Sequence, residues 1–270
     1  MSSEPIKTRQ VDCGCGKHGK YTGIAETFII MGTKREYMPY CPQCKIEDEV
    51  EWQKHLSLIK KNQEEKEKQE YLKKLQSMNI GKLFYESTFD NFDAYNDELR
   101  EHLETCRKFT ENPDGKLIML GEHGNGKTHL AISILKTLGG VIYTALEIAI
   151  NLRSSFNNGE RSEAEIFDEL CTANLLVIDE VEKIKESEWK NYWMSHVVGK
   201  RYNNMLPTIF ISNCHVQNDC TVPDPPCPKC LEFHLENDVL SRIIEDGIIM
   251  KFNSADYREK KRESRNNDKV

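Results

Sequence analysis

One glycine-rich segment constrains the fold of this 270-residue chain more than any other feature. It fits the pattern G-x-x-x-x-G-K-[ST] and consists of Gly121, Glu122, His123, Gly124, Asn125, Gly126, Lys127 and Thr128. An apolar run precedes it, and an amphipathic stretch that begins at His129 follows it. A strand, a glycine loop and a helix in this order surround a phosphate with backbone N–H groups and a helix N-terminus. The sequence therefore predicts a loop that binds nucleotide phosphates, bordered by His129.

Polar side chains follow two other apolar runs. The run 175–178 ends in Asp179 and Glu180, and the run 208–211 is followed closely by Asn213. The carboxyl ends of parallel strands meet at one edge of a sheet, and ligands bind at that edge. We therefore expect these three side chains to lie beside the glycine loop.

Each residue of this predicted site has an expected role with ATP. We expect Lys127 to contact the β- and γ-phosphates, and Thr128 to ligate Mg²⁺, which Asp179 holds through water. Glu180 is then the candidate base that polarises the attacking water, and Asn213 is the candidate amide that orients this water.

Short apolar runs alternate with amphipathic stretches through the larger part of the chain. The runs cover residues 117–120, 141–144, 175–178 and 208–211, and the stretches cover 128–138, 146–156 and 189–202. Strands that alternate with helices form βαβ units, in which helices cover both faces of a parallel sheet. The predicted fold class is therefore α/β, a P-loop domain whose parallel sheet is sandwiched by helices.

Eight of the ten cysteines fall into two clusters, which favours metal binding over disulfides if the protein is cytoplasmic. In the first cluster we expect Zn²⁺ to be bound by Cys15, His18, Cys41 and Cys44, with Cys13 as the alternative to His18. A segment this small needs the binding energy of the ion to fold.

The second cluster lies in a proline-containing stretch, residues 214–236, that reads as a surface insertion. An insertion of this length needs something to order it. We expect a second Zn²⁺ bound by Cys220, Cys227, Cys230 and His234; the alternative is a set of free thiols on a loop. The two remaining thiols, Cys106 and Cys171, read as isolated core residues.

A long polar segment separates the first cluster from the α/β part. Residues 45–78 contain neither Gly nor Pro and predict a long helix, and residues 60–70 contain no apolar side chain. The predicted order is a zinc-binding module at 1–45, a charged helical linker at 46–79, the nucleotide-binding domain at 80–260 and a basic tail at 261–270.

Charge and hydropathy exclude some classes of protein. The longest apolar runs have about four residues, whereas a bilayer span needs about 20, and the first residues lack the apolar region of a secretory signal. We therefore expect a cytoplasmic protein without a membrane partner. The net charge of −7 comes from residues 45–256, which carry −12 between basic ends, and this argues against nonspecific binding of duplex DNA.

This order of parts resembles the AAA+ ATPases, in particular the DnaC/DnaI-type helicase loaders and their relative, the transposition helper ATPase IstB. The resemblance covers about residues 80–260 and is carried by the segments 121–128, 177–180, 211–213 and 237–258. The stretch 81–92 resembles the family's segment that flanks the adenine. The resemblance implies that Arg242 acts as an arginine finger on a neighbour's γ-phosphate and that Arg258 acts as a second sensor of the nucleotide.

The resemblance also implies a function. A loader of this type would bind and hydrolyse ATP to switch its grip on a replicative hexameric helicase and on single-stranded DNA, and its copies would self-associate through the ATPase domain. The N-terminal zinc module would grip the helicase. The alternative is an IstB-like transposition helper that acts on duplex DNA. A zinc protein with a vestigial P-loop is disfavoured by the intact Lys127, Thr128, Asp179 and Glu180.

Overall fold

The chain divides into two compact units, Met1–Tyr71 and Leu72–Val270. The structure, a computed structural model, describes residues 8–13, 17–24, 26–30, 33–37, 41–155, 161–183, 188–216, 219–221, 227–257 and 259. Within these described ranges, no helix combines the length and the apolar character that a membrane crossing requires. The two units are described separately below.

The N-terminal unit contains two pairs of short antiparallel strands. Strand β1 (Thr8–Asp12) pairs with β2 (Lys20–Ile24), and β3 (Glu26–Ile30) pairs with β4 (Thr33–Tyr37). An isolated two-stranded hairpin is marginally stable at best in water. Among the side chains described before residue 72, only that of Cys41 is buried. The described part of this unit therefore has no apolar core to support its strands.

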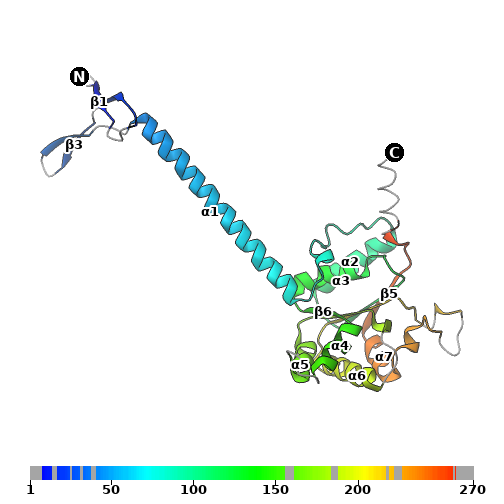
Figure 1. Cartoon of the computed structure of the whole chain (residues 1–270). Coiled ribbons are helices and arrows are strands. Elements are labelled where there is room, and N and C mark those ends of the chain that lie inside the picture. The colour runs from blue at the N-terminus through cyan, green and yellow to red at the C-terminus, as the bar shows by residue number, and fades with distance from the viewer. Residues whose placement is uncertain are drawn as a thin grey trace. The chain divides into compact units, whose positions relative to one another are not determined.

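Helix α1 (Pro42–Ser77) is a single 36-residue helix, close to the predicted range of 45–78 (Figure 1). Its exposed middle carries i,i+4 pairs such as Lys60 with Glu64. The helix ends at Ser77, and Asn79 shortly after it has a left-handed φ of 59°. Asn79 N donates to the carbonyl of Gln76, and Ile80 N donates to that of Leu75, at 2.9 and 3.1 Å. This pattern is a Schellman cap.

The last turn of α1 already belongs to the second unit. Leu75 and Met78 are buried in its core. Ile142 N donates to the carbonyl of Met78 at 3.1 Å, and Asn79 Nδ2 donates to the carbonyl of Ile142 at 2.8 Å. The sequence placed the domain boundary near residue 80, whereas the second unit begins at Leu72 because these apolar residues pack on the sheet.

The second unit is built on a five-stranded parallel sheet. The spatial order is β6–β7–β8–β5–β9. The strands are β5 (Lys116–Gly121), β6 (Val141–Thr144), β7 (Leu176–Asp179), β8 (Thr208–Ser212) and β9 (Gly247–Phe252). The first four match the predicted runs, and β9 was not predicted as a strand.

Helices cover both faces of this sheet (Figure 1). The short helix η1 (Lys82–Phe84) leads into α2 (Asp97–Glu111), which lies with α3 (Lys127–Leu138) on one face. The other face is covered by α4 (Ala145–Ser155), α5 (Glu163–Thr172), α6 (Glu188–Asn203) and α7 (Asn237–Ile244). Two more short helices are η2 (Val181–Lys183) and η4 (Leu231–Phe233).

Strand β5 shows how the sheet divides the core. Leu117 and Met119 pack on the α2 and α3 face, whereas Ile118 and Leu120 pack on the α4 to α7 face. All four are at most 2% exposed. Successive side chains point to opposite faces of a strand, so a strand that is buried on both faces has to be apolar throughout. The predicted α/β class is confirmed.

Candidate functional site

The glycine-rich loop joins the end of β5 to the start of α3 and requires its glycines. Gly124 and Gly126 have φ of 77° and 94°, a region that side chains disfavour. A Cβ at Gly126 would lie 2.5 Å from the Phe92 ring, and one at Gly121 would lie 2.1 Å from the carbonyl oxygen of Phe252. The loop is therefore held tightly between its neighbours.

Lys127 is the buried cation of this loop, with a side chain only 4% exposed. Its Nζ donates to the carbonyls of Gly121 and Glu122, both at 2.6 Å, and to Oδ1 of Asn125 at 3.1 Å. A buried ammonium needs such acceptors. Bound phosphate oxygens would provide charged acceptors, which form stronger hydrogen bonds than neutral carbonyls.

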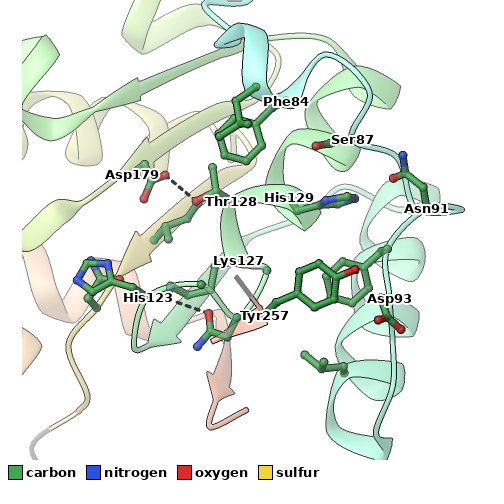
Figure 2. A pocket seen from close by; sticks show the side chains of 18 of the residues that line it. Phe84, Ser87, Asn91, Asp93, His123, Lys127, Thr128, His129, Asp179 and Tyr257 are labelled. Carbon is green, nitrogen blue, oxygen red and sulfur yellow. Dashed lines mark hydrogen bonds between the residues drawn. The ribbon is translucent and has the colours of Figure 1, made fainter. Parts of the chain in front are cut away.

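Thr128 and Asp179 meet across the site, as Figure 2 shows. Thr128 Oγ1 donates to Asp179 Oδ2 at 2.9 Å, and Glu180 N donates to Asp179 Oδ1 at 2.7 Å. Burial raises the pKa of Asp179, although these two hydrogen bonds act to lower it. A hydroxyl and a carboxylate are oxygen ligands of the kind that Mg²⁺ prefers. The donor set therefore fits Mg²⁺.

The two side chains expected to act on water are bonded to neighbours from one short helix, η2. Glu180, whose φ is 54°, pairs with the Lys183 ammonium. Asn213 Nδ2 donates to Glu182 Oε1 at 2.6 Å, and Ser212 Oγ donates to Glu182 Oε2 at 2.8 Å. Although burial acts to raise the pKa of Glu182, these and backbone hydrogen bonds lower it. Glu182 and Lys183 were not predicted from the sequence, where their only signal is their place just after Asp179 and Glu180.

A cavity of about 410 Å³ lies over the glycine loop. Its polar side includes Asp179, Glu180 and Asn213, and its other wall is formed by Leu83, Phe84, Phe92, Tyr95 and Leu99. His123 and His129 also line it (Figure 2). The His129 ring meets Phe92 edge-on at a centroid distance of 5.4 Å. An apolar wall beside a phosphate loop suits a flat base, which agrees with the expectation for residues 81–92.

The segment after β9 packs on the glycine loop. Tyr257 N donates to the carbonyl of Gly124 at 2.9 Å, and Asn125 Nδ2 donates to the carbonyl of Phe252 at 3.0 Å. Tyr257 also lines the cavity. Arg258, the expected second sensor, lies outside the described residues, as do residues 261–270 of the expected basic tail.

Arg242 lies on α7, away from the phosphate loop of its own chain. Its Nη1 donates to Asp238 Oδ2 at 3.2 Å, and its carbonyl accepts from Lys116 Nζ at 2.7 Å, at the start of β5. The glycine loop follows the opposite end of β5. Among the described residues that line the nucleotide cavity, Arg242 does not appear.

The first Cys/His cluster brings together Cys13, His18, Cys41 and Cys44, whose ligand atoms lie within 4.8 Å of one another. Cys44 Sγ lies 3.4 Å from Cys13 Sγ and 3.3 Å from His18 Nδ1. Cys13 and His18, which the sequence offered as alternatives, are both in the group, and Cys15 lies outside the described residues. A backbone hydrogen bond from Cys44 lowers the pKa of Cys41. Three sulfurs and an imidazole fit Zn²⁺.

The second cluster differs from its predicted ligand set. His215, Cys220, Cys227 and Cys230 lie within 4.8 Å of one another. His234, the predicted histidine, has its Nε2 at 2.8 Å from the carbonyl oxygen of Pro228 instead. His215 takes its place because the chain after β8 runs beside Cys230.

Comparison with known proteins gives consistent matches. The profile of the family described as IstB-like ATP binding protein matches residues 42–265, which is most of the chain. The replicative helicase loader DnaC of Escherichia coli K12 is 27% identical over 182 residues, which cover 63% of this chain and 74% of that protein.

Two solved structures share the fold. The crystal structure of the DnaC helicase loader aligns with a TM-score of 0.55 and 23% identity over 64% of this chain and 100% of that chain. The crystal structure of DnaI aligns with a TM-score of 0.52 and 17% identity over 65% of this chain and 96% of that chain. The second unit therefore has the AAA+ P-loop fold.

Proposed function

The chain belongs to the family of IstB-like ATP binding proteins, and on that premise we propose that it is an Mg²⁺-dependent ATPase that loads a replicative DNA helicase. The observation that carries the ATPase is the hydrogen bond between Thr128 and Asp179, which joins the P-loop hydroxyl to a strand-end carboxylate. The similarity to the replicative helicase loader of E. coli supports the loader function.

The protein groups divide the work of binding ATP between them. Lys127 and the loop amides hold the phosphates, and the apolar wall with Phe84 and Phe92 takes the base. Thr128 and Asp179 would hold Mg²⁺, which neutralises charge on the phosphate oxygens. Asp179 would hold Mg²⁺ as an ionised carboxylate. Burial raises the pKa of Asp179 and so favours the neutral form, and the charge of the ion would oppose this effect.

Hydrolysis requires two side chains to change partners. Glu180 has to leave Lys183 to polarise a water, and Asn213 has to leave Glu182 to orient that water. Because both groups are bonded elsewhere, a single chain should hydrolyse ATP slowly. An event that moves η2 would raise the rate.

Arg242 is suited to raise the rate of hydrolysis in a neighbouring copy by a second route. It lies on α7, beside the end of β5 that is opposite its own phosphate loop, and its charged partner within the described residues is Asp238. A guanidinium that reaches the γ-phosphate of the next subunit stabilises the charge of the transition state. ATPase activity would then depend on self-association, and Arg258 would contact the nucleotide in its own chain.

The N-terminal unit is the proposed docking module for the helicase. Zn²⁺ bound by Cys13, His18, Cys41 and Cys44 would hold its strands to the start of α1. The exposed polar face of α1 suits a connector rather than a duplex-binding surface. The assembled ATPase units would hold single-stranded DNA, and hydrolysis would release the loader.

A helicase-binding experiment tests the function. The full-length protein is mixed with the hexameric replicative helicase of the cell in which it is expressed naturally, and complexes are separated by size with ATP or ADP present. We expect a complex in ATP that weakens in ADP. Lys127→Ala should lose this nucleotide dependence, whereas Lys108→Ala, which removes an exposed lysine of α2, should behave as the wild type.

Two outcomes would contradict the loader. One is the absence of any nucleotide-sensitive complex with the helicase. The other is tight, salt-sensitive binding of duplex DNA by the protein alone, because counterion release makes such binding fall steeply with salt. That second outcome would favour a transposition helper.

A further inference from the structure

The second Cys/His cluster has the composition and spacing of a metal site. His215 follows β8, Cys220 lies in the following stretch, and Cys227 and Cys230 flank the sequence Pro-Lys. Cys227 Sγ lies 3.3 Å from Cys220 Sγ and 3.4 Å from Cys230 Sγ, and His215 Nε2 lies 3.4 Å from Cys230 Sγ. All four ligand atoms therefore face one point.

These distances agree with a tetrahedral ion. Zinc bonds of about 2.3 Å to sulfur and about 2.0–2.1 Å to nitrogen place the ligand atoms about 3.5–3.8 Å apart. A disulfide would join only two of the three sulfurs and would not account for the third sulfur or for the imidazole beside them. Three sulfurs and one nitrogen are the donors of a closed, structural zinc site.

The core of the second unit positions two of the four ligands. His215 N donates to the carbonyl of Lys229 at 2.9 Å, and Leu231 N donates to the carbonyl of His215 at 2.8 Å. Cys230 and Leu231 are almost fully buried, at 0% and 2% exposed. The backbone therefore places His215 beside Cys230, where both can bind one ion.

The same cluster adjoins the nucleotide site. His215 is two residues after Asn213, the side chain proposed to orient water, and Cys214 between them is buried at 3% exposed. Lys229 Nζ lies 3.9 Å from Glu122 Oε1 of the glycine loop. Lys251 of β9 pairs with Asp219 at 2.8 Å. The insertion therefore begins just after β8 and contacts both the glycine loop and β9.

We propose that His215, Cys220, Cys227 and Cys230 bind a zinc ion that fixes the end of β8 and thereby positions Asn213. The ion would hold the insertion against the end of β8. The Asn213 side chain would then have two positions, one bonded to Glu182 and one beside the reacting water. The four ligands would then affect hydrolysis only indirectly, through the position of Asn213. The metal site stands by itself, whereas its effect on hydrolysis rests on the proposed ATPase.

Counting metal per chain tests the site directly. Full-length protein, purified without chelator, should contain two zinc ions, one for each cluster. His215→Ala should lose one ion, whereas His234→Ala should keep both, because His234 Nε2 lies 2.8 Å from the Pro228 carbonyl oxygen and His234 does not belong to the group of four ligands. His215→Cys should restore the second ion, because a thiolate is also a zinc ligand.

Several metal counts would overturn the site. One zinc in the wild type that Cys41→Ser with Cys44→Ser reduces to zero would leave the second cluster without metal. Two ions in His215→Ala with one in His234→Ala would assign a different ligand set. The rescue by His215→Cys separates loss of a ligand from misfolding, because a misfolded variant would not regain the ion.

Steady-state ATPase assays then test the coupling. His215→Ala should lower kcat about 10- to 100-fold, the range expected when a reacting group is displaced by about 1 Å, and should leave ATP affinity within about threefold. His215→Cys should restore kcat together with the ion. An unchanged kcat after loss of the second ion would contradict the coupling. Absence of ATPase in the wild type would remove the proposed function, while the metal count would still decide the site.

Discussion

The two units of this chain rely on different sources of stability. Before residue 72, the described strands pair only two by two, and Cys41 is the single buried side chain among those described. After it, a five-stranded parallel sheet is buried between two layers of helices. Both units hold a cluster of three cysteines and one histidine. We therefore expect zinc to be required for folding of the first unit, and only to hold the insertion in place in the second.

Removal of zinc should produce the largest difference between the two units. Apparent binding energies of structural zinc are about 10–16 kcal/mol, and the first unit has no described core to replace them. We expect a chelator to abolish amide-exchange protection in β1 to β4 and to leave it in β5 to β8. Loss of protection in both units together would contradict the contrast.

The Arg242→Ala variant should affect only the second unit. An arginine finger contributes about 10³–10⁵ in kcat, so ATPase of the assembled protein should fall at least about 1,000-fold while nucleotide binding persists. Arg100→Ala, which removes an exposed arginine of α2, is the matched control. Equal ATPase of the Arg242 variant and the wild type, measured under assembly conditions, would exclude the finger.

Two leucines of α1 can locate the boundary between the units. Leu75 is 1% exposed and packs in the core of the second unit, whereas Leu58 is 55% exposed. Leu75→Ala should lower the free energy of unfolding of the second unit by about 2–5 kcal/mol, and Leu58→Ala should change it little. Denaturant titration measures both. Equal effects would place the boundary elsewhere in the helix.

The smallest effect should come from Lys183→Ala. Its ammonium pairs with Glu180, but both side chains are partly exposed, and such pairs contribute about 0–1 kcal/mol. Freeing Glu180 should raise the basal ATPase rate by at most about fivefold. A lower rate would show that Lys183 supports hydrolysis instead of restraining it.

The nucleotide site was predictable because its residues are close in sequence or follow strongly apolar runs. The loop 121–128, Asp179 and Asn213 each carry such a local signal, and the structure brings residues 123–128, Asp179 and Asn213 to one cavity. Glu182 and Lys183 carry no such signal, since a charged pair after a strand is most often solvated. Their roles appear only once η2 and β8 are side by side.

The second cluster shows why ligand spacing alone misleads. His234 stands four residues after Cys230, as in many zinc motifs, and so it was the expected ligand. The backbone pairing of His215 with the Lys229–Leu231 stretch brings the more distant histidine to the cysteines instead. Strand β9 was missed for a different reason: it is an edge strand with incomplete burial, and Lys251 interrupts its apolar residues.

Titration of the full-length protein with a fluorescent ATP analogue and Mg²⁺ tests the central claim, that the loop ending in Lys127 and Thr128 holds a triphosphate. One analogue should bind per chain. Lys127→Ala should weaken binding about 100-fold, since hydrogen bonds to charged groups contribute about 1.5–3 kcal/mol, and should leave the first zinc ion in place. No binding by folded wild-type protein, or equal binding by the Lys127 variant, would contradict the account.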